Sequence, residues 1–426
     1  METGAFGVTA ALLVAVVVLS ISWAVKRKHQ QRLFQRYGIP GPVPDFLFGN
    51  WNQLREDRIE VMEKWIKEYG KVFGFYEGEI PKVVISDLNM IKECFVKETH
   101  VFRDRMPLII EVEPIKSSLL ALRGEEWKRV RSVLNPAFSG AKMKLMLQVM
   151  NDCGNTLIDV ISERLTSGQD IIDVTNRSQA LSMDVITKCA LAWQLLLDSR
   201  TEAAQKGSGK VEITDRHLIA NCFVFLAGGF ETTATTLAFL LYELARHPEE
   251  QDRLYEEIKS QLADHSVNIP YDDVQKLKRM DMVVSECLRL YPPIVLFTAR
   301  VCSRDTSIAG YTVPAGTHVI LPTWHVHHNP NIWPEPQKFI PDRFLLGIGE
   351  EERRHAAAYV PFGLGHRECI GRRFALLELK TVLAKLIRAY VFSVCRETDD
   401  PMKVTVPTVT LNPVRNIKLR VTRRNT

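Results

Sequence analysis

The amino-acid sequence predicts a mostly α-helical protein with a minor β part. Apolar residues recur at helical spacing through most of the chain, whereas β-rich runs are short and confined to a few segments. One uninterrupted helical pattern extends from about Asp215 to Arg246. With 426 residues, 46% of them hydrophobic and 25% charged, the chain can bury a large core, which excludes disordered and collagen-like classes.

The charge and cysteine patterns exclude two further classes of protein. The net charge of +5 comes from 55 basic and 50 acidic residues, and much of the excess lies near the two ends. No dense basic stripe occurs, so we expect no nucleic-acid partner. The eight cysteines are scattered and none forms a C-x-x-C pair, which argues against a disulfide framework and a zinc site.

The first expected element is a transmembrane anchor at residues 3–25. This run carries no charge, is long enough to span a bilayer as a helix, and is followed by Lys26-Arg27-Lys28-His29. Basic flanks stay on the cytoplasmic side, so we expect a single-pass protein whose body faces the cytosol. The alternative is a cleaved signal peptide, but such a peptide carries its basic residues before a shorter apolar run.

Residues 26–44 form the expected basic and proline-rich linker. In Gly38-Ile39-Pro40-Gly41-Pro42-Val43-Pro44 the prolines exclude helix and favour a stiff extended chain between anchor and body.

The elements of the body follow in chain order. Two β-rich runs at 72–76 and 82–86, separated by Glu77-Gly78-Glu79, predict a hairpin, and the Ser/Gly/Lys-rich stretch 199–210 predicts a loop. More short strands are expected at 308–313, 318–321, 404–410 and 417–421. Helices are expected at 62–69, 89–97, 124–134, 140–165, 179–193, 215–246, 249–263 and 271–290.

The helix at 215–246 should cross the interior of the domain, because its centre is apolar on nearly every face. Glu231 and several threonines interrupt the apolar stretch, which argues against a second membrane span.

The segment 361–375 carries the most specific pattern. Gly365 and Gly371 bracket Cys369, and strong helix formers begin just after it. A cysteine at a helix N-terminus among amides and arginines is expected to have a lowered pKa and to favour the thiolate. The spacing of a phosphate-binding loop is absent, and a plain buried cysteine would not require these flanking glycines.

This segment resembles the haem-binding loop of the cytochrome P-450 monooxygenases in its pattern F-x-x-G-x-R-x-C-x-G. The matching residues are Phe362, Gly365, Arg367, Cys369 and Gly371. The resemblance implies the cytochrome P-450 fold, with residues 45–426 as one large haem-binding monooxygenase domain. It also implies haem b as cofactor and Cys369 as the thiolate ligand of its iron, a ligation that promotes O–O cleavage.

The same resemblance implies roles for the residues around the cysteine. Phe362 would pack near the proximal haem face, Arg367 would pair with a haem propionate, and Gly371 would let the backbone approach closely. His366 stands where the family usually has proline, a departure that could loosen the loop but removes no ligand.

A structural network is expected around Glu286, Arg289 and Arg343. Glu286 and Arg289 share one helix face, and Arg343 follows in Phe339–Phe344. This order resembles the family's Glu-Arg-Arg triad, a buried structural network to which we assign no chemical step.

The segment Ala227–Thr233 lies in the middle of the long helix. Two glycines inside a helix cost about 1 kcal/mol each relative to alanine, and an acid beside a hydroxyl is costly to bury without a function. The segment is similar to the family's oxygen-activation motif. By that resemblance Thr232 would hydrogen-bond dioxygen and relay protons, Glu231 would lie in the supply path, and Gly229 would leave room for oxygen. The alternative is a kinked core helix with incidental polar residues.

Further haem contacts are expected from Trp127 and Arg131, one helical turn apart in a segment similar to the family's W-x-x-x-R helix. Both would reach haem propionates, and Arg300 is another propionate candidate from the same resemblance. The histidines at 325, 327 and 328 are favoured as part of a loop with a family counterpart rather than as a metal cluster.

Partners and location also follow from the resemblance. It implies NADPH as electron source through NADPH–cytochrome P-450 reductase, cytochrome b5 as an optional second partner, and an apolar small-molecule substrate in contact with membrane lipid. The location would be the endoplasmic reticulum membrane. Four basic residues would fall on the proximal side by this resemblance and could steer an acidic redox partner, or they form a solvated charged face. They are Lys128, Arg129, Arg372 and Arg373.

The chain looks most like the clan that holds vertebrate drug-oxidising enzymes, thromboxane synthase and arthropod detoxification enzymes. By that analogy substrate contacts would come from Ser117–Leu122, Phe225, Ile294–Thr298 and Val409. The family's distal roof helices are missing from the sequence between Trp193 and Asp215. Comparison with the family suggests an internal deletion of about eighty residues at 194–195. An open pocket admits water, which favours uncoupled oxygen reduction.

Three functions therefore stay open at this point. The leading hypothesis is a haem-thiolate monooxygenase, the second is a haem isomerase of the thromboxane-synthase type, and the third is a truncated haem-binding product without catalysis. Thr232 argues against the isomerase, because an acid–alcohol pair serves oxygen activation.

Overall fold

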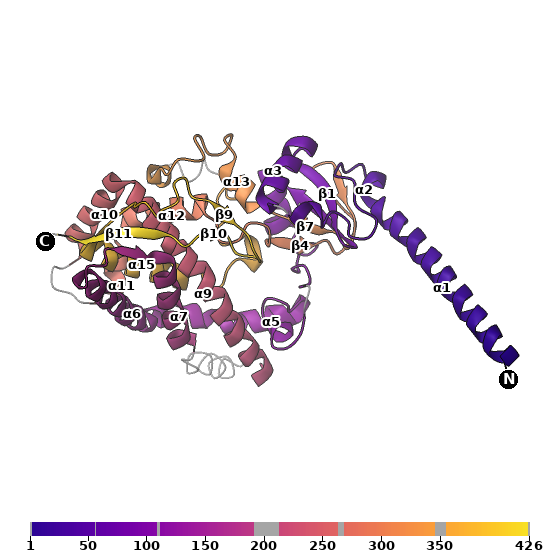
Figure 1. Cartoon of the computed structure of the whole chain (residues 1–426), viewed down its shortest axis with the longest axis horizontal. Coiled ribbons are helices and arrows are strands. Elements are labelled where there is room, and N and C mark those ends of the chain that lie inside the picture. The colour runs from indigo at the N-terminus through magenta and orange to yellow at the C-terminus, as the bar shows by residue number, and fades with distance from the viewer. Residues whose placement is uncertain are drawn as a thin grey trace. The chain divides into compact units, whose positions relative to one another are not determined.

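The computed structural model describes residues 2–55, 57–108, 111–190, 213–262, 268–345 and 355–424. Helices predominate and strands are few and short, which confirms the predicted fold class (Figure 1). The chain divides into two compact units, residues 1–103 with 299–322, and residues 104–298 with 323–426. The expected deletion at 194–195 and the expected loop at 199–210 lie outside the described residues.

The first unit begins with the helix α1 (Glu2–Gln31), which contains all of the expected anchor at residues 3–25. Its stretch Ala10–Gln31 is long and apolar enough to span a membrane, and only 6% of its most apolar window is buried. Near the end of α1 the side chain of Arg27 is buried and donates to the carbonyl oxygens of Phe46 and Gly78 at 2.9 and 2.6 Å. Arg27, one member of the expected basic flank, therefore makes hydrogen bonds inside the protein and is not available to the membrane surface.

The first unit contains a four-stranded sheet. β1 (Val72–Glu77) and β2 (Ile80–Ile85) form the expected hairpin, and Gly78 adopts the positive φ of 61° that its turn requires. β2 pairs in parallel with β7 (His318–Ile320), which pairs antiparallel with β4 (Ala299–Val301). The other elements of this unit are α2 (Leu33–Arg36), η1 (Gln53–Arg55), α3 (Arg58–Tyr69), α4 (Leu88–Lys92), η2 (Glu93–Lys97), β5 (Thr306–Ile308) and β6 (Tyr311–Val313).

The second unit is built around α9 (Asp215–Arg246), the expected long helix. Every residue from Thr233 to Ala245 is buried, so this half of α9 lies in the core, as its apolar composition predicts. Thr214 begins the helix with a reciprocal pair of hydrogen bonds to His217. The other helices here are η3 (Ile115–Ser117), α5 (Gly124–Leu134), η4 (Asn135–Phe138), α6 (Gly140–Thr166), α7 (Val174–Ala190), α10 (Pro248–Gln261), α11 (Tyr271–Val274), α12 (Lys278–Leu290), α13 (Thr323–His328), η5 (Pro341–Phe344), η6 (Gly365–Arg367) and α15 (Arg372–Ala389).

Short strands complete the second unit. β11 (Lys418–Arg423) pairs with both β3 (Ile171–Asp173) and β8 (Tyr390–Ser393). A separate hairpin joins β9 (Val404–Thr405) to β10 (Asn412–Pro413). The tip of this hairpin is held by the segment 293–294. The Leu411 amide donates to the Pro293 carbonyl at 2.9 Å, and Thr410 forms an isolated β-bridge with Ile294.

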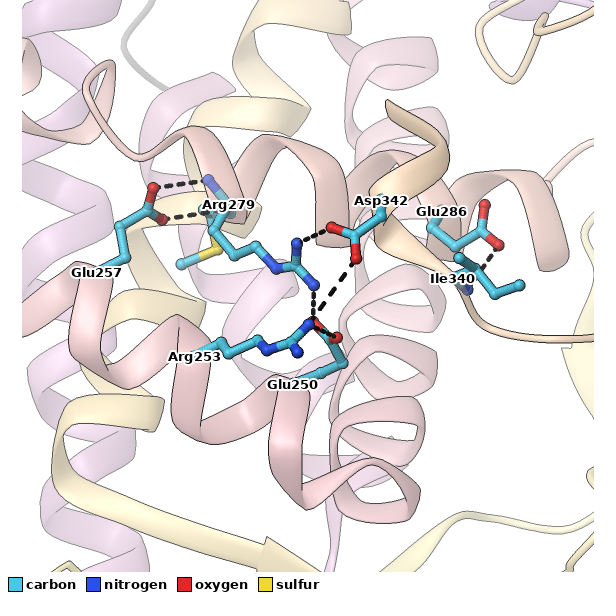
Figure 2. A network of polar contacts seen from close by, with 8 residues as sticks. Glu250, Arg253, Glu257, Arg279, Glu286, Ile340 and Asp342 are labelled. Carbon is cyan, nitrogen blue, oxygen red and sulfur yellow. Dashed lines mark hydrogen bonds and ion pairs between the residues drawn. The ribbon is translucent and has the colours of Figure 1, made fainter. Parts of the chain in front are cut away.

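The single helix expected at 271–290 is wrong, because the chain forms two helices, α11 and α12. The start of α12 is stabilised from a neighbouring helix, as Figure 2 shows. The Glu257 carboxylate on α10 accepts from the backbone amides of Arg279 and Met280 at 2.6 and 3.0 Å. These bonds satisfy amide donors that a helix start leaves without intrahelical partners, so α12 can begin at Lys278.

The two glycines in the middle of α9 face different surroundings. A Cβ added at Gly229 would lie 2.8 Å from Ile186 Cδ1 on α7, whereas a Cβ added at Gly228 would meet nothing within 4 Å. We predict that Gly229→Ala lowers the free energy of unfolding by about 1–3 kcal/mol through overpacking. Gly228→Ala, the matched control, should raise it by about 1 kcal/mol through helix propensity.

Thermal or urea unfolding of the two variants measures this difference. In an Ile186→Val background the same Gly229→Ala change should cost less, because the clashing Cδ1 methyl group is gone. Equal stability of the two alanine variants would show that the close approach of α7 and α9 does not depend on Gly229.

Candidate active site

The cysteine loop has a backbone that its glycines make possible. Gly363 and Gly365 adopt φ of 78° and 75°, the left-handed region that favours glycine. The Cys369 amide donates to the Phe362 carbonyl at 2.9 Å, which closes the loop immediately before α15. At Gly371 a Cβ would lie an ordinary 3.9 Å from Cys369 Sγ, so contacts within the chain do not explain that glycine.

The pKa of Cys369 differs from the sequence-based expectation. The residue is exposed, yet the protein atoms around its sulfur raise the pKa of the thiol above its ordinary value. The Gly371 amide and the guanidinium groups of Arg105 and Arg131 lower this pKa, but by less than burial of the sulfur raises it. The expected lowered pKa is therefore wrong for the protein alone. A coordinated metal ion deprotonates such a thiol outright, so this donor fits a metal ligand.

Arginine side chains converge on the backbone beside Cys369. Arg131 donates to the Glu368 carbonyl at 3.1 Å, and Arg105 donates to the Arg367 carbonyl at 2.9 Å. Arg367 is itself buried and ion-paired with Asp104 at 2.7 Å, while burial lowers the pKa of its guanidinium to about 9. One thiol beside several guanidinium groups suits an iron macrocycle that carries carboxylates.

Sequence reasoning missed Arg105. It lies in the loop before α5, far from Arg367 in sequence, and no motif marks it. The only available signal was its basic character.

Aromatic rings pack against the same arginines. The Arg367 guanidinium lies 3.8 Å from the ring centroid of Trp127 on α5, and the His366 ring meets Trp127 edge-on at 5.5 Å. The Phe362 ring lies under Arg372 at 5.7 Å. The structure thus brings Phe362, Trp127, Arg131 and Arg367 to the cysteine loop, with His366 packed where the family usually has proline.

Arg300 belongs to the other compact unit. It is buried in β4, where its guanidinium donates to the Ala299 carbonyl at 2.9 Å and lies 4.9 Å from the Phe95 ring centroid. Its contact with a haem propionate stays a prediction.

Glu231 and Thr232 lie on α9 and have separate hydrogen-bond partners. The two Glu231 carboxylate oxygens accept from the Thr410 hydroxyl at 3.1 Å and from the Asn412 amide at 3.0 Å. The Thr232 hydroxyl donates to the Gly228 carbonyl one turn earlier at 2.6 Å. An added Cβ would meet open space at Gly228, whereas at Gly229 it would meet Ile186 on α7. The expected role of Gly229 in leaving room for oxygen stays a prediction.

The expected triad forms a buried network. Arg289 makes two hydrogen bonds of 2.8 Å to the Glu286 carboxylate, and both side chains are fully buried. Arg343 Nε lies 3.2 Å from Glu286 Oε1. The Ile340 amide also donates to that oxygen at 3.0 Å, as Figure 2 shows. Arg289 reaches further to the carbonyl oxygens of His327, Pro336 and Lys338.

The histidines of α13 have structural contacts. His327 is buried and its Nε2 accepts from the Val360 amide at 2.9 Å, while burial lowers the pKa of its ring to about 3. His328 stacks on Trp324. In the described part of the chain no group of three or more metal-ligating side chains is arranged to hold an ion. His327 therefore links the Arg289 network to Val360, in the segment that precedes the cysteine loop.

Comparison with known proteins agrees with this geometry. The family model described as Cytochrome P450 matches residues 39–203 and 192–421. Cytochrome P450 3A5 of Homo sapiens is 30% identical over 495 residues, covering 97% of this chain and 96% of the relative. Cytochrome P450 3A28 of Bos taurus is 30% identical over 472 residues, with 92% of each chain covered. These matches include the cysteine loop, α9 and the triad, and the chain belongs to the cytochrome P450 family.

Proposed function

We propose that this chain is a membrane-anchored monooxygenase that inserts one oxygen atom from O2 into an apolar small molecule, such as a xenobiotic, a steroid or a fatty-acid-like compound. Membership of the family makes the protein a haem-containing oxidoreductase of the monooxygenase type. The haem, bound through a cysteine thiolate, supplies the activation of dioxygen. The observation that carries the proposal is the convergence of Trp127, Arg131 and Arg367 on the loop of Cys369.

Each residue of this cluster has a proposed role. Cys369 is the iron ligand, and Trp127, Arg131, Arg367 and the newly found Arg105 bind the haem carboxylates. For Arg300, contact with a haem carboxylate is what the family resemblance alone implies. Phe362 and Gly371 border the proximal face, where small or flat groups let the cofactor approach.

Glu231 and Thr232 are proposed to deliver protons on the distal side. The Thr232 hydroxyl can pass on a proton when it leaves its 2.6 Å bond to the Gly228 carbonyl, and Glu231 is the neighbouring acid that resupplies it. This acid–alcohol pair favours the monooxygenase over a haem isomerase, which needs no proton delivery to dioxygen.

Replacing the pair should uncouple the reaction. We predict that Thr232→Val and Glu231→Gln each lower the product formed per NADPH by about a hundredfold, the lower end of effects for general acids. Peroxide should rise in proportion for Thr232→Val. Product and peroxide are measured with reductase and a panel of apolar test substrates. Unchanged coupling in both variants would remove these residues from the proposal.

The surroundings of the proposed distal side are apolar. Phe225 on α9 packs edge-on against Phe138 at 5.4 Å, and the Leu119 amide donates to the Asn221 side chain on α9 at 2.9 Å. The second contact places Leu119 beside α9, and Leu119 and Leu122 share an apolar cluster with Leu218 of α9, against which Phe225 packs. This supports the proposed role of Ser117–Leu122, with Phe225, Ile294–Thr298 and Val409, in contacting an apolar substrate.

Electrons are proposed to come from NADPH through the membrane-bound reductase, as is typical of microsomal members of the family, with cytochrome b5 as an optional partner. Lys128 and Arg129 on α5 and Arg372 and Arg373 on α15 are all exposed, which supports a basic docking surface for an acidic partner. The apolar α1 supports an anchor in the endoplasmic reticulum membrane with the body on the cytosolic side.

An internal deletion at 194–195 remains part of the proposal. The alignment with the human relative has 495 positions against 426 residues in this chain, so at least 69 positions are filled by the relative alone. The family model also matches in two separate stretches, which overlap at residues 192–203. Both facts support the absence of the distal roof helices, and we expect strong peroxide formation from an open pocket.

NADPH consumption by the membrane-bound holoenzyme with reductase tests the proposed function. Oxygen-dependent conversion of an apolar substrate supports the monooxygenase. Rearrangement of a peroxide substrate without NADPH would instead support the isomerase, and the absence of haem binding would identify a non-catalytic product.

A further inference from the structure

The hairpin β9–β10 binds the acid that the proposed function uses. Thr410 and Asn412 come from its second half, and each donates to a different oxygen of Glu231. Thr410 is buried, so its hydroxyl has few competing partners, and Asn412 is oriented further by the Thr235 hydroxyl at 3.4 Å and the Thr410 carbonyl at 3.2 Å. The carboxylate is therefore held by two donors whose own positions are fixed.

This arrangement separates the acid from the alcohol. Both Glu231 oxygens are engaged by the hairpin, while the Thr232 hydroxyl is engaged by the Gly228 carbonyl. Two donors on different oxygens hold the carboxylate in its present orientation. Because each oxygen is held by a different donor, the Glu231 carboxylate must leave at least one of these bonds before it can turn toward Thr232 and pass on a proton.

We propose that Thr410 and Asn412 are positioning residues that restrain Glu231 and thereby set the rate of proton delivery. The inference rests on the proposed role of Glu231 and Thr232. In one cycle Glu231 takes one proton from water and gives one to the Thr232 hydroxyl, which passes on its own. Both groups end in their starting charge state.

The hairpin can connect this restraint to substrate binding. Its tip is attached to the 293–294 segment through Leu411 and Thr410, and Val409 beside them is exposed. Both Val409 and Ile294 are proposed substrate contacts. A substrate that moves the tip would therefore also move the two donors of Glu231.

Variants of the two donors test the restraint in the full-length holoenzyme with reductase, using NADPH-driven product formation from an apolar test substrate. Thr410→Val and Asn412→Ala should each raise the turnover rate by about tenfold, the low end of the change that loss of one hydrogen bond to a charged group produces. Their solvent deuterium isotope effects should fall toward one, because proton delivery becomes less rate-limiting. Thr410→Ser, which keeps the hydroxyl, should behave as the unaltered enzyme.

Thr408→Val is the matched control, since Thr408 is exposed on the same hairpin. The carbon monoxide spectrum of each variant verifies equal haem loading, and rates are given per loaded site. A purely structural role would leave the isotope effect of loaded enzyme unchanged.

Glu231→Gln distinguishes a failure of the proposed restraint from a failure of the proposed acid role of Glu231. Suppose that Glu231→Gln slows turnover, but Thr410→Val and Asn412→Ala have the same rate and isotope effect as the control Thr408→Val. The proposed restraint is then wrong, and the acid role of Glu231 stands. If Glu231→Gln leaves both rate and isotope effect unchanged, the acid role fails, and the restraint fails with it.

Discussion

Cys369→Ala should abolish the carbon monoxide band of thiolate-ligated haem. The other residues of the cluster, Trp127, Arg131 and Arg367, make contacts that do not pass through the Cys369 side chain, so the variant should still fold. Haem that it retains would show the spectrum of a neutral ligand, because the remaining side chains supply no thiolate at this position. NADPH-driven oxidation should fall below detection, since the thiolate promotes O–O cleavage.

Cys395→Ala provides the control for this experiment. Cys395 is a partly buried free cysteine near β8, and its loss should leave the band unchanged. Persistence of the thiolate band in Cys369→Ala would assign the ligand to another cysteine.

Glu286→Gln should be the most destabilising of the single substitutions considered. Glu286 and Arg289 are fully buried and joined by two hydrogen bonds of 2.8 Å. The substitution keeps the shape of the side chain but leaves the Arg289 charge buried without its counter-ion, a change that costs about 3–5 kcal/mol. Domains are stable by only about 5–15 kcal/mol, so the yield of haem-loaded protein should fall sharply.

Urea unfolding of the purified protein measures the cost. Arg253→Gln is the matched control, because Arg253 pairs with Glu250 at 3.0 Å near the surface, where such a pair contributes about 0–1 kcal/mol (Figure 2). A loss in Glu286→Gln no greater than that in Arg253→Gln would show that the network does not stabilise the domain.

The residues that the sequence identified correctly are those whose surroundings are local. The apolar run of α9 predicts its buried half, and Glu286 and Arg289 meet because they lie one helical turn apart. The hairpin of β1 and β2 likewise follows from alternation and a glycine turn.

The features that the sequence missed depend on distant partners. Arg105 reaches the Arg367 carbonyl, and Thr410 and Asn412 reach Glu231, across more than 170 residues in each case. The start of α12 is set by a carboxylate on α10, and the packing role of Gly229 by Ile186 on α7. The pKa of Cys369 was expected to fall because of its arginines, but the direction depends on how many protein atoms displace water from the sulfur.

The reduced carbon monoxide difference spectrum of the unaltered 426-residue chain tests the central claim most directly. The claim is that the loop of Cys369, together with Trp127, Arg131 and Arg367, forms a complete haem-thiolate site in this chain. The predicted result is a Soret band at the position of thiolate ligation in membranes that contain the protein. A band at the position of neutral ligation, or none from protein that is folded and present, would contradict it.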